Sequence, residues 1–461
     1  MKIAFVYMND TPGVGFGAGY VASAIIDAGY NITFFDTYWD PLKKIAKVVI
    51  KGNYDILMIS SMTMAFPNAV ELIKQIKDKM PNITVLVGGI HTVIVGGKIL
   101  DECPLIDYLC IGEGESFVIE FLKYFNKEPF FGIKNLVYRK DGRVVVNELR
   151  PPEDLSKLPR FCWKLFRNES VAERGSSLMV SATRGCPYSC TYCCNSVYLK
   201  MYGKKYLRFR PIESIISELR YLVKTYKPGF FYFGDEMIFF NKERAIELFS
   251  KVKENFNIHY GCMARVEHIN KEIVDLISDT GCKYIAMGIE CGNEEFRKKY
   301  LNRHMSNEQI INAYTLIKNA GIQCISFNMI GYPFDNDDFL AQETLNINLK
   351  IKPDFAQISV FYPLPGTELY KRCIEFDLID DEKAANTRTF HKDSILKGKS
   401  LLSKRNDMNA ILNGNETSAI KCLETDIKGT RKFERKISNL VMKSKKMRMK
   451  IERKLYDVGL L

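Results

Sequence analysis

The chain of 461 residues contains two series of short apolar runs, each run separated from the next by a segment long enough for one helix. This alternation constrains the fold strongly, because short buried strands that alternate with helices form parallel sheets. The first series predicts a doubly wound α/β domain over residues 1–130, with ligands bound beyond the carboxyl ends of its strands. Its five runs lie at residues 3–8, 32–35, 56–60, 84–87 and 108–111.

The second series predicts an incomplete parallel (β/α)6 barrel over residues 171–385, whose active-site groups would lie on the loops after the strands. Its runs lie at residues 178–182, 230–233, 260–263, 284–289, 325–330 and 355–361. Between the two series, strand-like runs flank an Asp141-Gly142 turn. Residues 131–170 are therefore expected to form a hairpin and a linker.

Residues 386–461 form a basic C-terminal region that is expected to be helical or partly disordered. They contain 19 Lys and Arg against 8 Asp and Glu, so nearly all of the net charge of +12 lies there. We favour a solvated face for this region, with peripheral contact to anionic lipid headgroups as the alternative. Aromatic residues are sparse after Phe433, which argues against a nucleic-acid partner.

Composition and the first residues bear on where the protein acts. No apolar run reaches the roughly 18 residues of a membrane-spanning helix, and the first residues, MKIAFVYMND, lack the features of a secretory signal. We therefore expect a cytoplasmic protein, in which the 13 cysteines do not form a disulfide framework.

Three of the cysteines cluster directly after the first strand of the predicted barrel. Cys186, Cys190 and Cys193 form a C-x3-C-x2-C pattern on a loop, which indicates a metal site. Structural zinc needs four protein ligands, and no second Cys or His pair follows, so zinc is the weaker alternative. A [4Fe–4S] cluster held by three thiolates leaves one iron open to another ligand. Cys194, next in the chain, is expected to be structural.

This pattern, with Tyr192 before the last cysteine and a βα barrel behind it, resembles the radical S-adenosylmethionine (SAM) superfamily. The resemblance implies that the open iron binds SAM, and that reductive cleavage of SAM gives methionine and a 5′-deoxyadenosyl radical. It also implies SAM contacts at successive strand ends. The residues concerned are Gly234, Asp235 and Glu236 for the amino group, and Arg265, Glu290, Asn328 and Gly331 for the carboxylate, ribose and adenine.

Two segments, Pro363–Leu369 and the linker that contains Pro159, resemble elements of one subgroup of this superfamily. Members of that subgroup have an N-terminal cobalamin-binding domain of flavodoxin-like topology. In such domains small residues at the strand ends let the backbone approach a bulky ligand. The residues that match are Ser60, Ser61, Gly88, Gly89, His91, Gly112, Glu113 and Gly114.

Two observations leave alternatives open for this first domain. The Asp-x-His-x-x-Gly loop that supplies a cobalt ligand in many mutases is absent from the sequence, and His91 is otherwise a loop histidine without a ligand. The rival ligand is NAD, since residues 13–18 fit G-x-G-x-x-G/A. Against NAD, residues 9–12 separate the strand from Gly13, whereas the fingerprint needs its turn immediately after the strand.

Together the resemblances imply a cobalamin-dependent radical SAM enzyme with a [4Fe–4S] cluster, SAM and cobalamin as cofactors. Its expected reaction is methylation of an unactivated carbon of a small-molecule, lipid, tetrapyrrole or peptide substrate, with a flavodoxin or ferredoxin as electron donor. A radical cyclase or rearrangement enzyme and a non-catalytic protein that binds the same cofactors are the alternatives. An RNA methylthiotransferase of this superfamily would bind a second cluster through three N-terminal cysteines. Such an enzyme is disfavoured, because the cysteines before the barrel, Cys103, Cys110 and Cys162, do not cluster.

Overall fold

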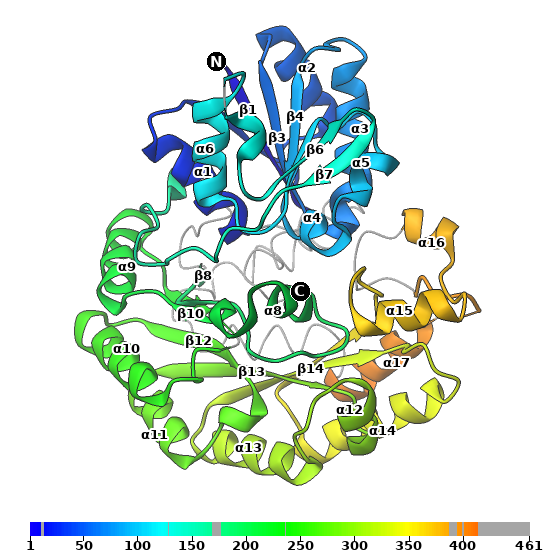
Figure 1. Cartoon of the computed structure of the whole chain (residues 1–461). Coiled ribbons are helices and arrows are strands. Elements are labelled where there is room, and N and C mark those ends of the chain that lie inside the picture. The colour runs from blue at the N-terminus through cyan, green and yellow to red at the C-terminus, as the bar shows by residue number, and fades with distance from the viewer. Residues whose placement is uncertain are drawn as a thin grey trace, which may run out of the picture. The chain divides into compact units, whose positions relative to one another are not determined.

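The structure is a computed structural model that describes residues 1–10, 13–127, 129–167, 177–235, 237–386, 394–398 and 401–413 (Figure 1). Its internal contacts divide the chain into two units. The first contains residues 1–170, 193–208 and 364–367, and the second contains residues 171–192, 209–363 and 368–461. Each unit is built around a parallel sheet.

The first unit is a doubly wound sheet, which confirms the prediction for this part of the chain. Five parallel strands have the order β2-β1-β3-β4-β5, the order of flavodoxin-like folds. They are β1 (Ile3–Met8), β2 (Ile32–Asp36), β3 (Ile56–Ser61), β4 (Thr84–Gly88) and β5 (Tyr108–Cys110).

Helices cover both faces of this first sheet, and each face has its own apolar core. α1 (Phe16–Asp27) packs beside α6 (Glu115–Tyr124), and α2 (Leu42–Gly52) packs beside α3 (Phe66–Lys77) (Figure 1). Because both faces are buried, the strands read as nearly continuous apolar runs, which is why their positions could be predicted.

The predicted hairpin extends this first sheet. β6 (Leu136–Lys140) pairs antiparallel with β5 and with β7 (Arg143–Val146). Asp141 and Gly142 both have positive φ, at 51° and 75°, as a two-residue hairpin turn requires. The folded first unit therefore continues past residue 130.

The second unit is a six-stranded, wholly parallel sheet with the strands in chain order, which confirms the incomplete barrel. Its strands are β8 (Ser177–Val180), β11 (Phe230–Phe233), β12 (His259–Ala264), β13 (Cys282–Glu290), β14 (Gln323–Ile330) and β15 (Phe355–Val360). Helices lie along the outer face of this sheet in Figure 1. They include α9 (Ile212–Tyr226), α10 (Lys242–Asn255), α11 (Lys271–Asp279), α13 (Asn307–Asn319) and α14 (Asp337–Ile351).

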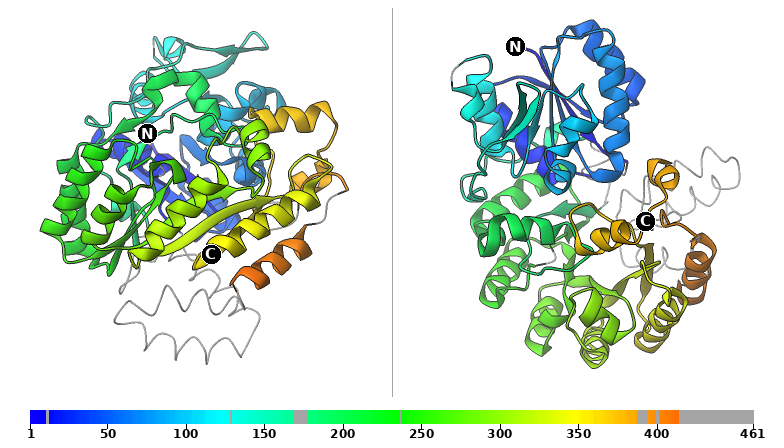
Figure 2. Two further views of the ribbon diagram at one scale, coloured as in Figure 1. Left: turned by 90° about the horizontal axis from the view of Figure 1, so that it is seen from below. Right: turned by 45° about the vertical axis from the view of Figure 1, so that its right-hand side comes forward.

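The edge strand β15 is covered by the last described helix, α17 (Leu402–Asn413), shown in orange beside it in Figure 2. The Asn413 side chain accepts from the Ala356 N–H at 2.8 Å and donates to the Ala356 carbonyl at 2.8 Å. Arg405 Nε donates to the Ile358 carbonyl at 2.9 Å. Side chains of α17 therefore satisfy backbone groups that an exposed edge would leave open.

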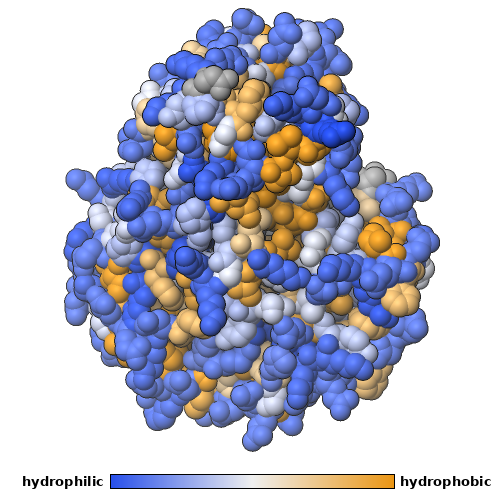
Figure 3. All heavy atoms as spheres, in the orientation of Figure 1, coloured by the Kyte–Doolittle hydropathy of each residue, from blue (hydrophilic) through white to orange (hydrophobic). Residues whose placement is uncertain are grey.

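Most of the predicted basic region, residues 414–461, lies outside the described residues, and so do residues 387–393 and 399–400. Among the described residues, none of the helices combines the length and the apolar character needed to cross a bilayer. Hydrophilic side chains cover most of the face shown in Figure 3.

Candidate functional site

The cysteine loop follows β8 and the short strand β9 (Thr183–Arg184). Cys186 and Cys190 are buried, and Cys193 is partly exposed just before α8 (Asn195–Tyr202). The connection after α12 (Glu294–Tyr300) holds the loop: Asn302 Nδ2 donates to the carbonyl and the hydroxyl of Ser189, at 3.1 and 2.8 Å. Thr191 donates its hydroxyl hydrogen to the Tyr300 carbonyl at 2.5 Å. The loop is therefore held by contacts far along the chain.

The donor set of this loop fits an iron–sulfur cluster better than a single metal ion. Among the residues that the structure describes, no group of three His, Cys, Asp or Glu side chains converges on one ion position. A cubane cluster does not require such convergence, because each of its thiolate ligands binds a different iron atom. Three cysteines on one loop supply the soft thiolate donors that the cluster needs, and two of them are buried away from water.

Asp235, at the end of β11, anchors the strand end that leads into the cysteine loop. Its carboxylate accepts from the N–H groups of Ala182 and Thr183 at 2.7 and 2.9 Å. The hydroxyls of Ser181 and Thr183 donate to it at 3.0 and 3.1 Å. Burial raises the pKa of Asp235, and these hydrogen bonds oppose the rise. These four hydrogen bonds all come from residues 181–183 at the strand end. Glu236, the other predicted carboxylate, lies outside the described residues.

Arg265, at the end of β12, contacts the cysteine loop directly. Its Nη1 lies 3.6 Å from Cys190 Sγ, and its guanidinium carbon lies 3.6 Å from the centre of the Tyr188 ring. Nη2 pairs with Glu267 at 2.5 Å. The Tyr188 hydroxyl forms a 3.0 Å hydrogen bond with His268 Nε2. The sequence pattern did not single out Glu267, His268 or Tyr188, although the first two lie within three residues of Arg265, at a predicted strand end.

Glu290, at the end of β13, lies beside a buried arginine that the sequence analysis also missed. Arg303 Nη1 lies 3.5 Å from Glu290 and 3.2 Å from the Tyr192 hydroxyl, and its Nη2 donates to the Gly288 carbonyl at 2.6 Å. Arg303 comes from the connection between α12 and α13, so it carried no strand-end signal. Glu290 has φ of 68°, an unusual value for a residue with a side chain.

Several buried polar atoms in these two groups have no hydrogen-bond partner within the described residues. They are Arg265 Nε, Glu267 Oε2, His268 Nδ1 and Arg303 Nε. Burial alone would raise the pKa of Glu267, but Arg265 and Arg303 outweigh it and hold that pKa below its usual range. An anionic acceptor and several cationic or neutral donors left open beside the cysteine loop suit a zwitterionic ligand with hydroxyl groups, such as SAM.

Two of the predicted SAM contacts, Asn328 and Gly331, lie within β14 and directly after it. Asn328 lies within the strand, and its amide bonds Asn348 of α14 in both directions, with Nδ2–Oδ1 distances of 2.8 and 3.5 Å. Gly331, with φ of 83°, packs against Leu401, and its N–H donates to Asp337 at 2.8 Å. Gly234 has room for a Cβ, whose closest neighbour would be Met179 at 3.5 Å. Asn328 Nδ2 also donates to the Ser326 hydroxyl at 3.0 Å and to the Gln357 carbonyl at 3.3 Å, so the Asn328 amide is held by protein groups on both sides.

In the first unit, the predicted strand-end glycines allow close backbone approach. A Cβ on Gly89, which has φ of 99°, would lie 2.6 Å from the Ser61 carbonyl and 3.2 Å from the Ser60 hydroxyl. A Cβ on Gly112, with φ of 107°, would lie 2.5 Å from the Tyr202 hydroxyl of α8. Gly88 and Gly114 are less tight, with nearest distances of 3.6 and 3.1 Å.

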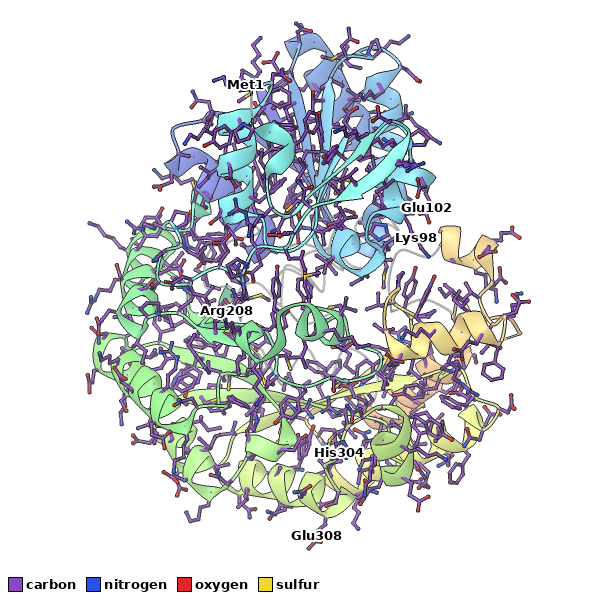
Figure 4. The ribbon with its side chains drawn as sticks, in the orientation of Figure 1. Met1, Lys98, Glu102, Arg208, His304 and Glu308 are labelled. Atoms are coloured by element: carbon purple, nitrogen blue, oxygen red, sulfur yellow. The ribbon has the colours of Figure 1, made fainter. Side chains whose placement is uncertain are left out.

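Two further segments join this edge of the first unit. Gly366, within the predicted Pro363–Leu369 motif, has φ of 78°, and its Cβ would lie 2.9 Å from the Ile94 carbonyl of α4 (Ile90–Val95). The Glu113 N–H donates to Tyr202 at 3.1 Å. The Glu113 carboxylate pairs with Arg208, which is labelled in Figure 4. Residues 364–367 of the motif and α8 thus belong to the first unit, where they contact α4 and the residues after β5.

His91, on α4, is buried and neutral. Its Nδ1 lies 3.3 Å from the Thr63 hydroxyl, and its ring stacks on Phe66 with centroids 4.0 Å apart. Nε2 has no partner within the described residues, and burial lowers the pKa of His91 to about 4. A neutral imidazole with one open nitrogen can bind a further polar group.

In the glycine-rich segment that suggested NAD, a protein side chain fills the space beside Gly15. The Tyr7 ring lies where a Cβ on Gly15 would be, and α1 begins only at Phe16. β1 ends at Met8, so the tight turn of a dinucleotide fingerprint is missing.

Two family models match the chain: the B12 binding domain over residues 9–122 and the radical SAM superfamily over residues 180–342. An uncharacterized methyltransferase of Pyrococcus horikoshii is 27% identical over 375 residues, which cover 80% of each chain. The anaerobic magnesium-protoporphyrin IX monomethyl ester cyclase of Rubrivivax gelatinosus is 24% identical over 394 residues, 80% of this chain and 70% of that one.

The fold is also that of a solved enzyme. The radical S-adenosylmethionine methyltransferase TsrM of Kitasatospora setae, determined with cobalamin and a [4Fe–4S] cluster bound, matches with a TM-score of 0.66 at 15% identity. The match covers 81% of this chain and 75% of that chain. At this identity the likeness concerns the fold.

Proposed function

We propose that this chain, a cobalamin-dependent radical SAM enzyme with a B12-binding domain and a radical SAM domain, methylates an unactivated carbon of a small molecule. The observation that carries the proposal is the cysteine loop, in which Cys186 and Cys190 are buried, with Arg265 against Cys190 and unsatisfied polar atoms beside it. A methyltransferase among the relatives favours methyl transfer, and the cyclase relative favours ring closure as the second candidate.

The cofactors of such an enzyme are a [4Fe–4S] cluster, SAM and cobalamin, which together supply a carbon radical and a transferable methyl group. In our proposal, Cys186, Cys190 and Cys193 hold the cluster. Glu267 and His268 offer an acceptor and a ring nitrogen to SAM, and Arg303 orients Glu290. The burial of Cys186, Cys190, Arg265 and Arg303 helps to exclude water from a reactive radical.

In the first unit, we assign the cobalamin contacts to Ser60, Ser61, Gly88, Gly89, His91, Gly112 and Gly114. Gly89 and Gly112 are the residues whose positive φ and close neighbours require glycine. The Glu113 side chain is assigned to the ion pair with Arg208 instead. A lipid, tetrapyrrole or peptide substrate fits the proposal, with a flavodoxin or ferredoxin as electron donor.

The test uses the full chain, reconstituted anaerobically with iron, sulfide and hydroxocobalamin, and incubated with dithionite, methyl-labelled SAM and cell extract. We expect 5′-deoxyadenosine and an extract compound whose mass carries the labelled methyl group. A ring-closed product without label would support the cyclase instead. Absence of 5′-deoxyadenosine would refute both.

A matched pair of variants locates the site. Cys190→Ala should remove the cluster absorbance and 5′-deoxyadenosine formation. Cys194→Ala, at the neighbouring cysteine, should retain both. Equal SAM cleavage by the two variants would contradict the assigned ligands.

A further inference from the structure

We propose that Arg265 sets the reduction potential of the cluster by donating an N–H···S hydrogen bond to the Cys190 thiolate. This inference rests on the proposed function, because it takes Cys190 as a cluster ligand. The family resemblance implied that Arg265 contacts SAM. We assign Arg265 to the metal centre instead.

The geometry fixes the arginine in place. Arg265 is only 5% exposed, and its Nη1 lies 3.6 Å from Cys190 Sγ, within the range of hydrogen bonds to sulfur. The guanidinium lies over Tyr188, whose ring centre is 3.6 Å from the guanidinium carbon. Tyr188 is itself held by the 3.0 Å hydrogen bond to His268. The cation therefore has little freedom to turn away from the sulfur.

A cation and a hydrogen bond at a cluster thiolate stabilise the reduced cluster more than the oxidised one, because reduction adds one negative charge. Hydrogen bonds to the sulfurs and local net charge are among the factors that set such potentials. The electron comes from an external reductant, dithionite in the test below, and its uptake breaks no bond and moves no proton. Arg265 should thus raise the potential of the cluster.

Glu267 carries the opposite charge to Arg265, so a variant of Glu267 tests the direction in which charge shifts the reduction potential. Its Oε1 pairs with Arg265 Nη2 at 2.5 Å, while Oε2 has no partner within the described residues. Because its pKa lies below its usual range, this carboxylate is ionised at neutral pH. Removal of the glutamate charge should therefore shift the potential in the direction opposite to removal of the arginine charge.

The experiment is a redox titration of the reconstituted full-length protein without SAM, followed by the electron paramagnetic resonance signal of the reduced cluster. At the wild-type midpoint, Arg265→Gln should lower the ratio of reduced to oxidised cluster about tenfold, or about 59 mV for one electron. This corresponds to one charge-assisted hydrogen bond. Glu267→Gln should raise the ratio, and Arg265→Lys, which keeps the charge, should lower it less than Arg265→Gln. Lys253→Gln, at an exposed ion pair with Asp279, is the control and should leave it unchanged.

The outcomes separate the two proposals. An unchanged potential in Arg265→Gln, or shifts of the same sign in Arg265→Gln and Glu267→Gln, would overturn the role of Arg265 alone. Absence of a cluster signal in wild-type protein would overturn the proposed function itself. If Arg265→Gln fails to hold a cluster, Glu267→Gln and Arg265→Lys decide: an unchanged potential in both variants overturns the role.

Discussion

The guanidinium of Arg208 forms two parallel hydrogen bonds with the carboxylate of Glu113, Nη1 to Oε2 at 2.7 Å and Nη2 to Oε1 at 2.5 Å. Nη1 also donates to the Glu153 carbonyl at 2.7 Å. Both side chains are largely buried, at 15% and 9% exposure. The pair fastens the segment 193–208, which begins at a cysteine of the loop, to the strand ends of the first unit.

Removing either partner should destabilise the first unit strongly. Arg208→Ala leaves the Glu113 carboxylate buried without its cation, which costs about 3 kcal/mol or more. Both tryptophans, Trp39 and Trp163, lie in the first unit, so their fluorescence during urea unfolding measures its stability. The double variant Arg208→Ala, Glu113→Ala should be less unstable than the sum of the single variants. If the two single losses in the free energy of unfolding add up to the loss in the double variant, Arg208 and Glu113 do not stabilise each other and the prediction is wrong.

Gly89 should not tolerate a side chain. Gly89→Ala places a Cβ 2.6 Å from the Ser61 carbonyl at a φ of 99°, so strain and steric overlap act together. We expect a loss of about 2 kcal/mol or more in the same fluorescence assay, together with weaker cobalamin binding. Gly17→Ala is the control, since this exposed helical glycine has open space around its Cβ. It should be neutral or stabilise by up to about 1 kcal/mol.

The order of strands and the cysteine loop could be predicted from the sequence because both signals are local. A parallel strand buried on both faces is an apolar run, and three thiols within eight residues need no fold to bring them together. Arg303 and Tyr192 are different, since they meet across 111 positions. No local pattern reports such a contact, and the loop that carries Arg303 does not follow a strand.

Asn328 shows that a motif near a strand end does not by itself identify the contacts that its side chains make. The predicted run over residues 325–330 ends where β14 ends, at Ile330, so Asn328 lies inside the strand and shares a face with Ser326 two positions earlier. Both side chains bond Asn348, with the Ser326 hydroxyl donating at 2.6 Å. The extent of the strand could thus be predicted from its apolar run, whereas the hydrogen bonds between Asn328 and a helix later in the chain could not.

Protonation of His91 should destabilise the first unit at acid pH. The pKa of His91 is about 4 in the folded protein and about 6.5 when unfolded, so the unfolded chain binds the proton more tightly. The contribution of His91 to the free energy of unfolding is therefore fully present above pH 6.5. The free energy of unfolding falls by about 3 kcal/mol between pH 6.5 and pH 4. The expected loss should appear in urea unfolding at pH 7 and pH 5, as the difference between wild type and His91→Gln.

That comparison also removes the contribution of Asp36. Burial raises the pKa of Asp36 to about 7, so this carboxyl stabilises the folded state below pH 4, and that stabilisation is lost as pH rises to 7. The effect has the opposite sign to that of His91 and is common to both proteins. Parallel pH curves for wild type and His91→Gln would contradict the prediction.

Asp235→Asn should impair cluster assembly without unfolding the second unit. Asparagine keeps the shape but turns one acceptor into a donor that faces the N–H groups of Ala182 or Thr183. Each unsatisfied buried donor costs about 1–3 kcal/mol, concentrated at the strand end before the cysteine loop. We expect a lower iron content after reconstitution, while circular dichroism is retained. Asp279→Asn, on the surface, should bind iron like wild type.

Asn413 should control both the stability and the solubility of the second unit. Asn413→Ala removes the pair of 2.8 Å hydrogen bonds to the backbone of Ala356 and reopens part of the β15 edge. The loss of two partners costs about 1–3 kcal/mol, and an open strand edge invites pairing with another chain. Thermal unfolding should shift downward and gel filtration should show larger species. Ile411→Ala, at an exposed position on α17, tests whether any truncation of this helix has the same effect. An equal loss in that variant would assign the stability to the helix as a whole and not to the edge contact of Asn413.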